Sequence, residues 1–197
     1  GAGTYSVVAT DQNGCAVSIS VDITQTEEMA ITETHSDYTG YGVSCNGATD
    51  GFIDVEVTGG TGIYTYEWNG ELADEDLSDI GAGTYSVVAT DENGCSVSIS
   101  VDITQTEETI AVTETHSDYT GYGVSCNGAS DGFIDITVTG GTDNYTYLWS
   151  NGQTNEDLSG LGAGTYSVEI NDENDCPISI EVEITETDPM AISETHS

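Results

Sequence analysis

The chain has 197 residues, 36 of which are Asp or Glu, and it contains no Lys or Arg, so its formal net charge is −36. Without basic side chains, a protein offers no positive surface to nucleic acid or to an anionic membrane, and it has no Lys or Arg for phosphoryl-transfer or Schiff-base chemistry. No apolar stretch approaches the roughly 20 residues of a membrane-spanning helix, so we expect no direct membrane insertion. The hydrophobic content of 36% is regularly placed, which argues against a disordered acidic tail.

The sequence repeats itself with a period of about 80 residues. The motif GAGTYSVVATDQNGC at 1–15 recurs with small changes at 81–95 and 162–176, and the segment 33–60 recurs at 114–141. Completion of the partial ends by neighbouring chains is disfavoured, because the two ends together are much shorter than one repeat. We therefore expect four segments: the C-terminal part of a preceding repeat (1–28), a complete repeat (29–108), a second complete repeat (109–188) and the start of a following repeat (189–197).

Apolar and polar residues alternate with a period of two through both complete repeats, which is typical of half-buried antiparallel strands. A first strand is expected at Met29 and Ile31. The further predicted strands lie at 53–57, 64–68, 85–89 and 97–103 in the first repeat, and at 134–138, 145–149 and 178–184 in the second.

Turn signals separate these strands. Gly-Gly at 59–60 and Asn-Gly at 69–70 and 93–94 favour hairpin turns, because Gly and Asn tolerate positive φ. The segment 71–80 is expected to form one helical turn or a loop held by Leu77 and Ile80. The sequence therefore predicts an all-β protein, made of tandem small immunoglobulin-like antiparallel β-sandwiches in an extended array.

Each complete repeat contains two cysteines at the same spacing, and we predict a disulfide within each repeat, Cys45 with Cys95 and Cys126 with Cys176. Such a bond would add about 3–4 kcal/mol to a modest core by the loop-closure model. Cys15 would have its partner outside the chain. Free buried thiols are the alternative, and zinc is disfavoured because the sequence has no Cys-x-x-Cys pair. Disulfides would indicate an oxidising location outside the cytoplasm.

A string of motifs runs through both repeats. In the first it reads Cys-Asn-Gly-Ala-Thr-Asp-Gly (45–51), Gly-Gly-Thr-Gly (59–62), Tyr-Thr-Tyr followed by Trp68, Gly-Ala-Gly-Thr-Tyr (81–85) and Asp-Glu-Asn-Gly-Cys (91–95). This string resembles the SprB repeat of Bacteroidetes surface proteins. The resemblance implies a giant, tandemly repeated cell-surface adhesin, exported by the type IX secretion system and used in gliding, attachment or biofilm formation. The family has no established catalytic residues, so none is predicted and we expect no enzyme.

The acidic side chains require cations, and their hard oxygen atoms suit Ca²⁺, which takes six to eight such ligands. The alternative is a solvated acidic surface with a diffuse ion cloud and turn-forming Asp residues. The candidate Ca²⁺ ligands are Asp50, Asp74, Glu75, Asp76, Asp91, Glu92 and Asn93 in the first repeat, and Asp131, Asp157, Asp172 and Glu173 in the second.

Two further sets of residues recur near the start of each repeat. Tyr38 and Tyr41, with their counterparts Tyr119 and Tyr122, interrupt the alternating pattern, so they either contact a ligand such as a sugar or pack one repeat on the next. His35, His116 and His196 occupy one equivalent position; they form either a pH- or metal-sensitive junction or exposed polar residues.

These features predict a structural and adhesive segment of a long extracellular fibre on the cell surface. Its partners would be neighbouring repeats of the same chain, and laterally associated fibres or surface glycans are further candidates. The alternative function is a multivalent module in which each repeat captures Ca²⁺ or a glycan.

Overall fold

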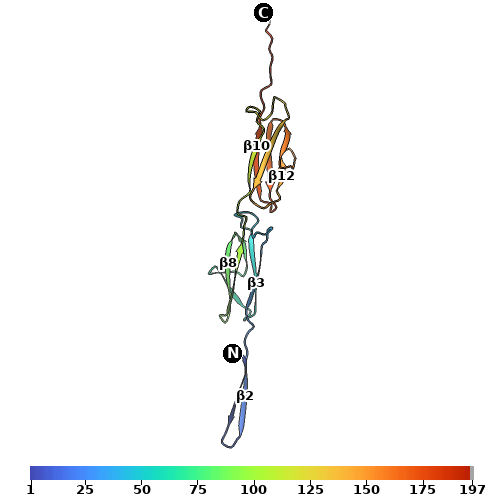
Figure 1. Ribbon diagram of the computed structural model, residues 1–197. Coiled ribbons are helices and arrows are strands. Elements are labelled where there is room, and N and C mark those ends of the chain that lie inside the picture. Colours follow the sequence, from blue (N-terminus) through green and yellow to red (C-terminus); the bar gives the residue numbers. More distant parts are fainter. Residues whose placement is uncertain (196–197) are drawn as a thin grey trace. The chain divides into compact units, whose positions relative to one another are not determined.

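A computed structural model describes residues 1–195, and the described part consists of β-strands and connecting segments (Figure 1). No helix that could cross a lipid bilayer is present among these residues. The strands are β1 (Gly3–Thr10), β2 (Ala16–Ile23), β3 (Ala30–His35), β4 (Gly51–Thr58), β5 (Tyr64–Trp68), β6 (Glu71–Ala73), β7 (Leu77–Ile80), β8 (Gly83–Asp91), β9 (Ser96–Ile103), β10 (Ala111–His116), β11 (Gly132–Thr139), β12 (Thr146–Trp149), β13 (Leu158–Leu161), β14 (Gly164–Asn171) and β15 (Pro177–Ile184).

The chain folds as two compact units. The first comprises Gly1–Thr34, Ile53–Leu77 and Thr84–Val101, and the second comprises His35–Phe52, Ser78–Gly83 and Asp102–Ser197. The second unit therefore contains the second sequence repeat together with three stretches of the first repeat, residues 35–52, 78–83 and 102–108.

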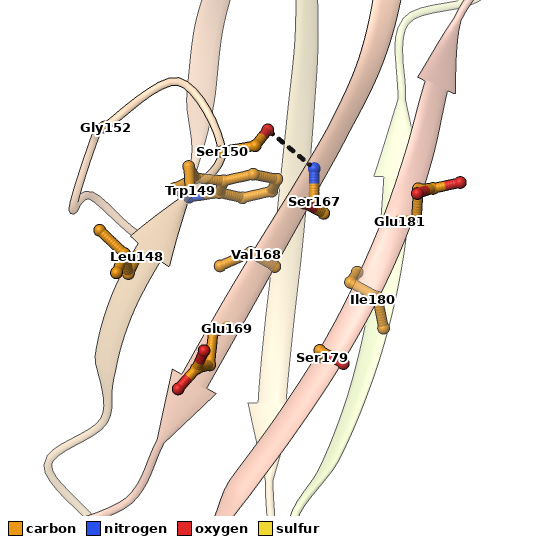
Figure 2. A pocket seen from close by; sticks show the side chains of 10 residues that line it. All are labelled: Leu148, Trp149, Ser150, Gly152, Ser167, Val168, Glu169, Ser179, Ile180 and Glu181. Carbon is orange, nitrogen blue, oxygen red and sulfur yellow. Dashed lines mark hydrogen bonds between the residues drawn. The ribbon is translucent and has the colours of Figure 1, made fainter.

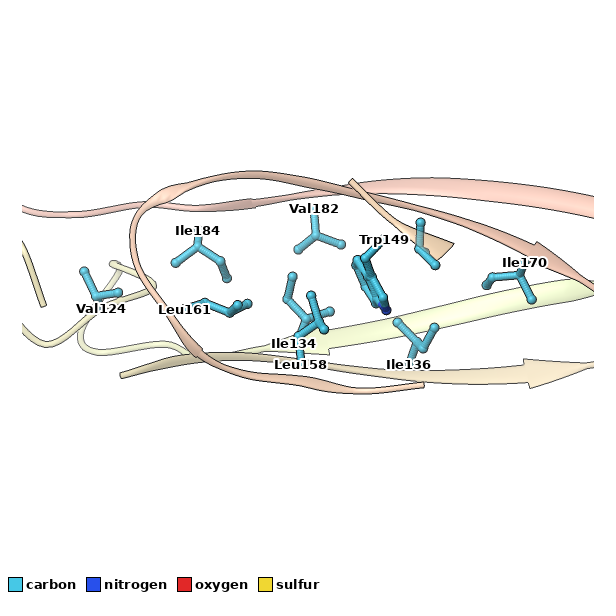
Figure 3. Close-up of a cluster of buried hydrophobic side chains, with 10 residues drawn as sticks. Val124, Ile134, Ile136, Trp149, Leu158, Leu161, Ile170, Val182 and Ile184 are labelled. Atoms are coloured by element: carbon cyan, nitrogen blue, oxygen red, sulfur yellow. The ribbon is translucent and has the colours of Figure 1, made fainter. Parts of the chain in front are cut away.

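The second unit is built around a β-sandwich. One sheet has the strand order β10-β11-β13 and the other has the order β12-β14-β15, and all the strand pairs are antiparallel. Side chains from both sheets meet in one apolar core, in which Trp149 is only 1% exposed (Figure 3). The buried core residues are Val124, Ile134, Ile136, Trp149, Leu158, Leu161, Val168, Ile170, Val182 and Ile184.

The alternating sequence accounts for this core. Along β11, Ile134 and Ile136 point inward and are buried, whereas Asp135 and Thr137 between them are exposed. Successive side chains of a strand point to opposite faces, so one apolar stripe is enough to define the inner face. β15 follows the same rule, with Val182 and Ile184 buried. The predicted strands and inner faces are therefore confirmed.

In the first unit, β5 pairs with both β6 and β8. The turn between β5 and β6 contains Asn69 and Gly70, whose φ angles are 49° and 87°. Positive φ at both central residues is the requirement of a type I′ hairpin turn, so the Asn-Gly signal is confirmed at this position.

β1 and β2 form a separate two-stranded antiparallel sheet. Its apolar side chains are exposed: Val7 is 61% exposed, although Val87 at the equivalent position of the first complete repeat is fully buried. Hence the same sequence buries its inner face only where a second sheet covers it.

The all-β, antiparallel sandwich class predicted from the sequence is confirmed.

The expectation for 71–80 was wrong, because this segment forms the short strands β6 and β7 instead of a helical turn or a loop. In the second repeat the equivalent of β7 is β13, whose Leu158 and Leu161 are 1% and 4% exposed. These residues belong to the core as a strand and do not merely hold down a loop.

Candidate functional site: a cross-linked loop and turn

A disulfide in the second unit joins the two complete repeats. Cys45 and Cys176 are bonded with an S–S distance of 2.08 Å, and their Cα atoms are 5.8 Å apart, which is an ordinary separation for a disulfide. Cys45 lies in the junction loop (residues 36–50), which connects β3 to β4. Cys176 lies in the junction turn (residues 172–176), which connects β14 to β15. The bond therefore connects a loop of the first repeat to a turn of the second.

The predicted pairs Cys45–Cys95 and Cys126–Cys176 were wrong. Cys95 and Cys126 are exposed free thiols, as is Cys15, and the expectation that the partner of Cys15 lies outside the chain stays untested.

The second repeat shows why one repeat cannot close its own pair. The loop that contains Cys126 is held at the end of β15, where the side-chain amide of Asn127 donates to the Thr187 carbonyl at 2.8 Å. Cys176 immediately precedes β15 at its other end. An eight-residue strand spans about 25 Å, whereas disulfide-bonded Cα atoms lie within about 7 Å of each other.

Hydrogen bonds accompany the disulfide. The hydroxyl of Thr39 donates to the side-chain oxygen of Asn174 at 2.9 Å, and the side-chain amide of Asn174 donates to the Tyr38 carbonyl at 3.2 Å. The sulfur of Cys176 lies 3.2 Å from the carbonyl oxygen of Ser44. Asn174 therefore satisfies both ends of its amide on the junction loop, and the two segments are matched in polar groups as well as linked by sulfur.

The junction loop is held in shape by its own hydrogen bonds. Ser36, which is 3% exposed, donates its hydroxyl proton to the Gly42 carbonyl and accepts a hydrogen bond from the backbone N–H of Phe52. Tyr38 and Tyr41 exchange backbone hydrogen bonds across a tight turn. A loop that is fixed in this way presents Cys45 in a defined position.

Two contacts fasten the junction loop to the residues after β9. The side-chain amide of Asn46 donates to the Thr106 carbonyl at 2.6 Å, and the backbone N–H of Gly47 donates to the side chain of Gln105 at 2.9 Å. These contacts repeat those around Cys126 in the second repeat, so both repeats place this cysteine beside the end of their last strand.

A buried carboxylate organises the junction turn. Asp172 is 3% exposed and accepts hydrogen bonds from the backbone N–H groups of Asn174, Cys176 and Thr142, each at 2.9 Å. Burial alone would raise the pKa of Asp172, but these hydrogen bonds stabilise the charged form and lower the pKa below its ordinary value. In the first repeat, burial and backbone hydrogen bonds act on Asp91 in the same opposing ways, and the pKa of Asp91 is likewise lowered.

Several other predicted Ca²⁺ ligands also serve as acceptors for the protein itself. Asp50 and Asp131 accept from the backbone N–H groups of Ser44 and Ser125, and these serine contacts lower the pKa of both acids. The remaining contacts are those of Asp76 with the Val55 N–H, Asp157 with the Ile136 N–H, Glu75 with the Tyr66 hydroxyl and Glu173 with the Asn144 amide.

The other candidates serve backbone contacts or face solvent. The backbone N–H of Asn93 donates to Asp91, the carbonyl of Asp74 accepts from the Trp68 indole, and Glu92 is exposed. Among residues 1–195, no group of three or more His, Cys, Asp or Glu side chains lies close enough together to hold a metal ion.

The tyrosine and histidine candidates differ in their surroundings. Tyr38 contacts the junction turn through its carbonyl oxygen, whereas Tyr119 and Tyr122 are 40% and 41% exposed. His116 lies 3.0 Å from Glu114 at the surface. His196 lies outside the described residues.

A hollow of about 610 Å³ lies on the outer side of the β12-β14-β15 sheet (Figure 2). Ser150 accepts a hydrogen bond from the backbone N–H of Ser167 there, and the carboxylates of Glu169 and Glu181 come from different strands and do not point toward each other. A pair of carboxylates that faced a common substrate would be needed for glycoside hydrolysis, and this hollow does not provide one.

Comparisons with known proteins place two segments in a family. The SprB repeat family model matches residues 43–72 and 124–154. A comparison with curated proteins finds no match. Among solved structures, the fibronectin(III)-like modules of Clostridium thermocellum CbhA match with a TM-score of 0.30 and 13% identity, covering 76% of this chain and 93% of that chain.

A second solved structure is a tetra-tandem repeat from the extending region of a large adhesion protein, with a TM-score of 0.27 and 18% identity. The match covers 93% of this chain and 56% of that one. The family segments begin just before Cys45 and just before Cys126, so each includes one of the two loop cysteines. The SprB repeat family model thus matches one segment in each complete sequence repeat, and the family resemblance predicted from the sequence is confirmed.

Proposed function

We propose that the chain is a spacer segment of a cell-surface adhesin, in which tandem SprB repeats carry mechanical load outside the cell. The observation that carries this proposal is the Cys45–Cys176 disulfide, which links one repeat to the next. Stable disulfides are typical of proteins outside the cytoplasm, so the bond supports an extracellular location. A bond between repeats, as opposed to a bond within one, passes tension directly from one repeat to the next.

The path of a pulling force explains the benefit. When the chain is pulled from both ends, tension passes from Cys45 through the sulfur atoms to Cys176 and bypasses the residues between them. The strands β4 to β14 lie in this bypassed stretch. They are therefore protected from extension while the disulfide is intact, and unfolding under load is confined to the residues outside it.

The surface charge suits the same role. A formal charge of −36 with no compensating Lys or Arg makes neighbouring fibres repel each other. Repulsion of this kind limits non-specific clumping of a protein that is displayed at high density. Its range is set by salt, because charges further apart than about 8 Å are largely screened at physiological ionic strength.

Labelling of intact cells tests the location. Antibodies raised against residues 29–188 should bind cells without permeabilisation, and a signal that depends on permeabilisation would contradict the proposal.

Replacement of residues 29–188 by an unrelated pair of β-sandwiches of equal length tests the spacer role. Attachment of the cells should persist after this replacement, whereas its loss would indicate that the repeats themselves recognise a ligand such as a glycan.

A further inference from the structure

We propose that the loop and the turn joined by Cys45 and Cys176 have unjoined counterparts in this chain: the loop that contains Cys126, and the two turns that contain Cys95 and Cys15. Each of these counterparts cross-links to the complementary loop or turn of another repeat of this sequence. This proposal concerns a covalent interaction site and goes beyond the spacer role. It does not depend on that role, because it would hold for the same repeats in any oxidising location.

The residues that make the junction are present again in each unjoined half. The free loop (residues 117–131) repeats the Tyr-Thr pair and the Ser-Cys pair of the junction loop as Tyr119, Thr120, Ser125 and Cys126. The free turns (residues 11–15 and 91–95) repeat the Asn-x-Cys motif of the junction turn as Asn13 with Cys15 and Asn93 with Cys95.

The free loop has the shape of the joined one. In the free loop the backbone N–H of Tyr119 donates to the Tyr122 carbonyl at 2.6 Å, and that of Ser125 donates to Asp131 at 3.1 Å. The equivalent distances in the junction loop are 2.7 Å and 3.1 Å. In these two contacts the free loop matches the joined one without a partner, which lowers the entropy that binding would cost.

The free turns are organised in the same way. Asp91 accepts from the backbone N–H groups of Asn93 at 3.0 Å and Cys95 at 2.8 Å, matching the contacts of Asp172 in the junction turn. In residues 11–15, Asp11 makes the same two contacts, at 2.9 Å and 2.8 Å.

Cavities mark both the joined and the unjoined sites. At the junction, a cavity of about 240 Å³ is lined by Cys45 and Asn46 from one repeat and by Ile110 and Cys176 from the other. Beside Cys126 a hollow of about 600 Å³ is lined by the equivalent Asn127 and by Met190, whose sequence position corresponds to Ile110.

A third hollow lies beside Cys95. It measures about 400 Å³ and is lined by Met29 and Gly60, the equivalents of Ile110 and Gly141 at the junction. The loop residues that would correspond to Cys45 and Asn46 do not line it. The two open hollows are therefore larger versions of the junction cavity: the hollow beside Cys95 lacks the equivalents of Cys45 and Asn46, and the hollow beside Cys126 lacks the equivalent of Cys176.

The joined loop is more buried than the free loop. Tyr41 and Cys45 are half-buried in the junction loop, whereas Tyr122 and Cys126 at the same positions are exposed. Because the sequences of the two loops are nearly identical, the partner repeat is the cause of the difference.

The occupant of each free half is thus the complementary half of another repeat, and in a solution of this chain a second copy supplies it. Bond formation requires an oxidant, and a low-molecular-weight disulfide such as oxidised glutathione is sufficient. One thiolate attacks that disulfide and releases one glutathione thiol. The thiolate of the partner repeat then attacks the mixed disulfide, forms the Cys–Cys bond and releases the second glutathione thiol, so two protein thiols are oxidised as one disulfide is reduced.

The test uses the complete 197-residue chain at about millimolar concentration, reduced and then reoxidised with oxidised glutathione. Disulfide-linked multimers should form, and peptide mass mapping should find Cys126 of one copy bonded to Cys15 or Cys95 of another. The Cys126→Ser variant should stay monomeric, as should the double variant Cys15→Ser/Cys95→Ser. All three proteins should still form the Cys45–Cys176 bond, which shows that each is folded.

Two results would overturn the proposal. One is the formation of multimers by Cys126→Ser to the same extent as by the unmodified chain, or a predominance of Cys126–Cys126 bonds, since either would mean that exposed thiols react at random. The other is the absence of any intermolecular bond at Cys126 under conditions in which Cys45 and Cys176 pair fully. Neither result depends on the outcome of cell labelling.

Discussion

The carboxylate of Asp172 accepts a hydrogen bond from the backbone N–H of Cys176 at 2.9 Å, and so couples a buried acid to the cysteine that crosses between repeats. The pKa of Asp172 is lower in the folded chain than its ordinary value of 3.8. A carboxyl group whose folded pKa is lowered stabilises the fold fully above its unfolded pKa, and this stabilisation is lost as the pH falls through the folded pKa.

Asp172→Asn should therefore lower the free energy of unfolding by about 1–2 kcal/mol at pH 7, because hydrogen bonds to a charged acceptor are weakened. The difference from the unmodified chain should shrink as the pH falls below about 4. Glu181→Gln, at an exposed position of β15, is the control and should have little effect at any pH. Denaturant unfolding between pH 7 and pH 2 measures both, and a pH-independent loss in Asp172→Asn would count against this assignment.

Gly132 marks a close approach that no side chain tolerates. A Cβ atom at this position would lie 2.9 Å from the Leu161 carbonyl oxygen and 3.2 Å from a methyl group of Ile184. Gly132→Ala should therefore destabilise the second repeat by about 1–3 kcal/mol. At Gly162 the nearest atom would be 3.7 Å away, so Gly162→Ala should change stability by no more than about 0.5 kcal/mol. Equal thermal unfolding temperatures for the two variants would contradict this packing.

Calcium and magnesium should stabilise the chain to the same extent at equal concentration. Both ions screen the mutual repulsion of the 36 acids, while Asp91 and Asp172 already have their oxygen atoms occupied by backbone N–H groups. Thermal unfolding in matched CaCl2 and MgCl2 checks this. A rise in the unfolding temperature that only calcium produces, and that disappears in Asp91→Asn and Asp172→Asn, would instead establish an ordered Ca²⁺ site.

Reduction should lengthen the chain under force. The disulfide closes a loop with a sequence separation of 131 residues, and an extended residue spans about 3.3–3.6 Å. Single-molecule stretching should therefore release about 450 Å of additional length after reduction, and the same amount in Cys45→Ser without reduction. Cys126→Ser should stretch like the unmodified chain. If the oxidised chain already shows the full length, the disulfide does not bridge the two repeats.

The strands and the core could be read from the sequence because they depend on a local pattern. The alternation of Ile134 and Ile136 with polar residues determines which face of β11 is buried, whatever the rest of the chain does. The two strands in the segment 71–80 could not be predicted in this way, because they have only three and four residues, too few to show an alternation of period two.

The disulfide pairing could not be read from cysteine spacing, because that spacing is the same whether a bond lies within one repeat or between two. Strand direction did carry a signal. Cys45 precedes the first of the four long predicted strands and Cys95 precedes the fourth. Antiparallel strands reverse direction at each step, so these two positions fall at opposite ends of a sandwich. The junction partner Asn174 gave no sequence signal of its own, because its two hydrogen bonds go to residues more than 130 positions away.

Peptide mass mapping of the unreduced chain distinguishes a cross-link between repeats from cross-links within each repeat, because the peptides around all five cysteines differ in sequence. Digestion with pepsin at low pH keeps thiol exchange slow, since the thiolate is the reactive form. The cross-link between repeats predicts a peptide pair that contains Cys45 and Cys176, with Cys15, Cys95 and Cys126 recovered as thiols or bonded to another copy. Recovery of Cys45 with Cys95 and of Cys126 with Cys176 would contradict it.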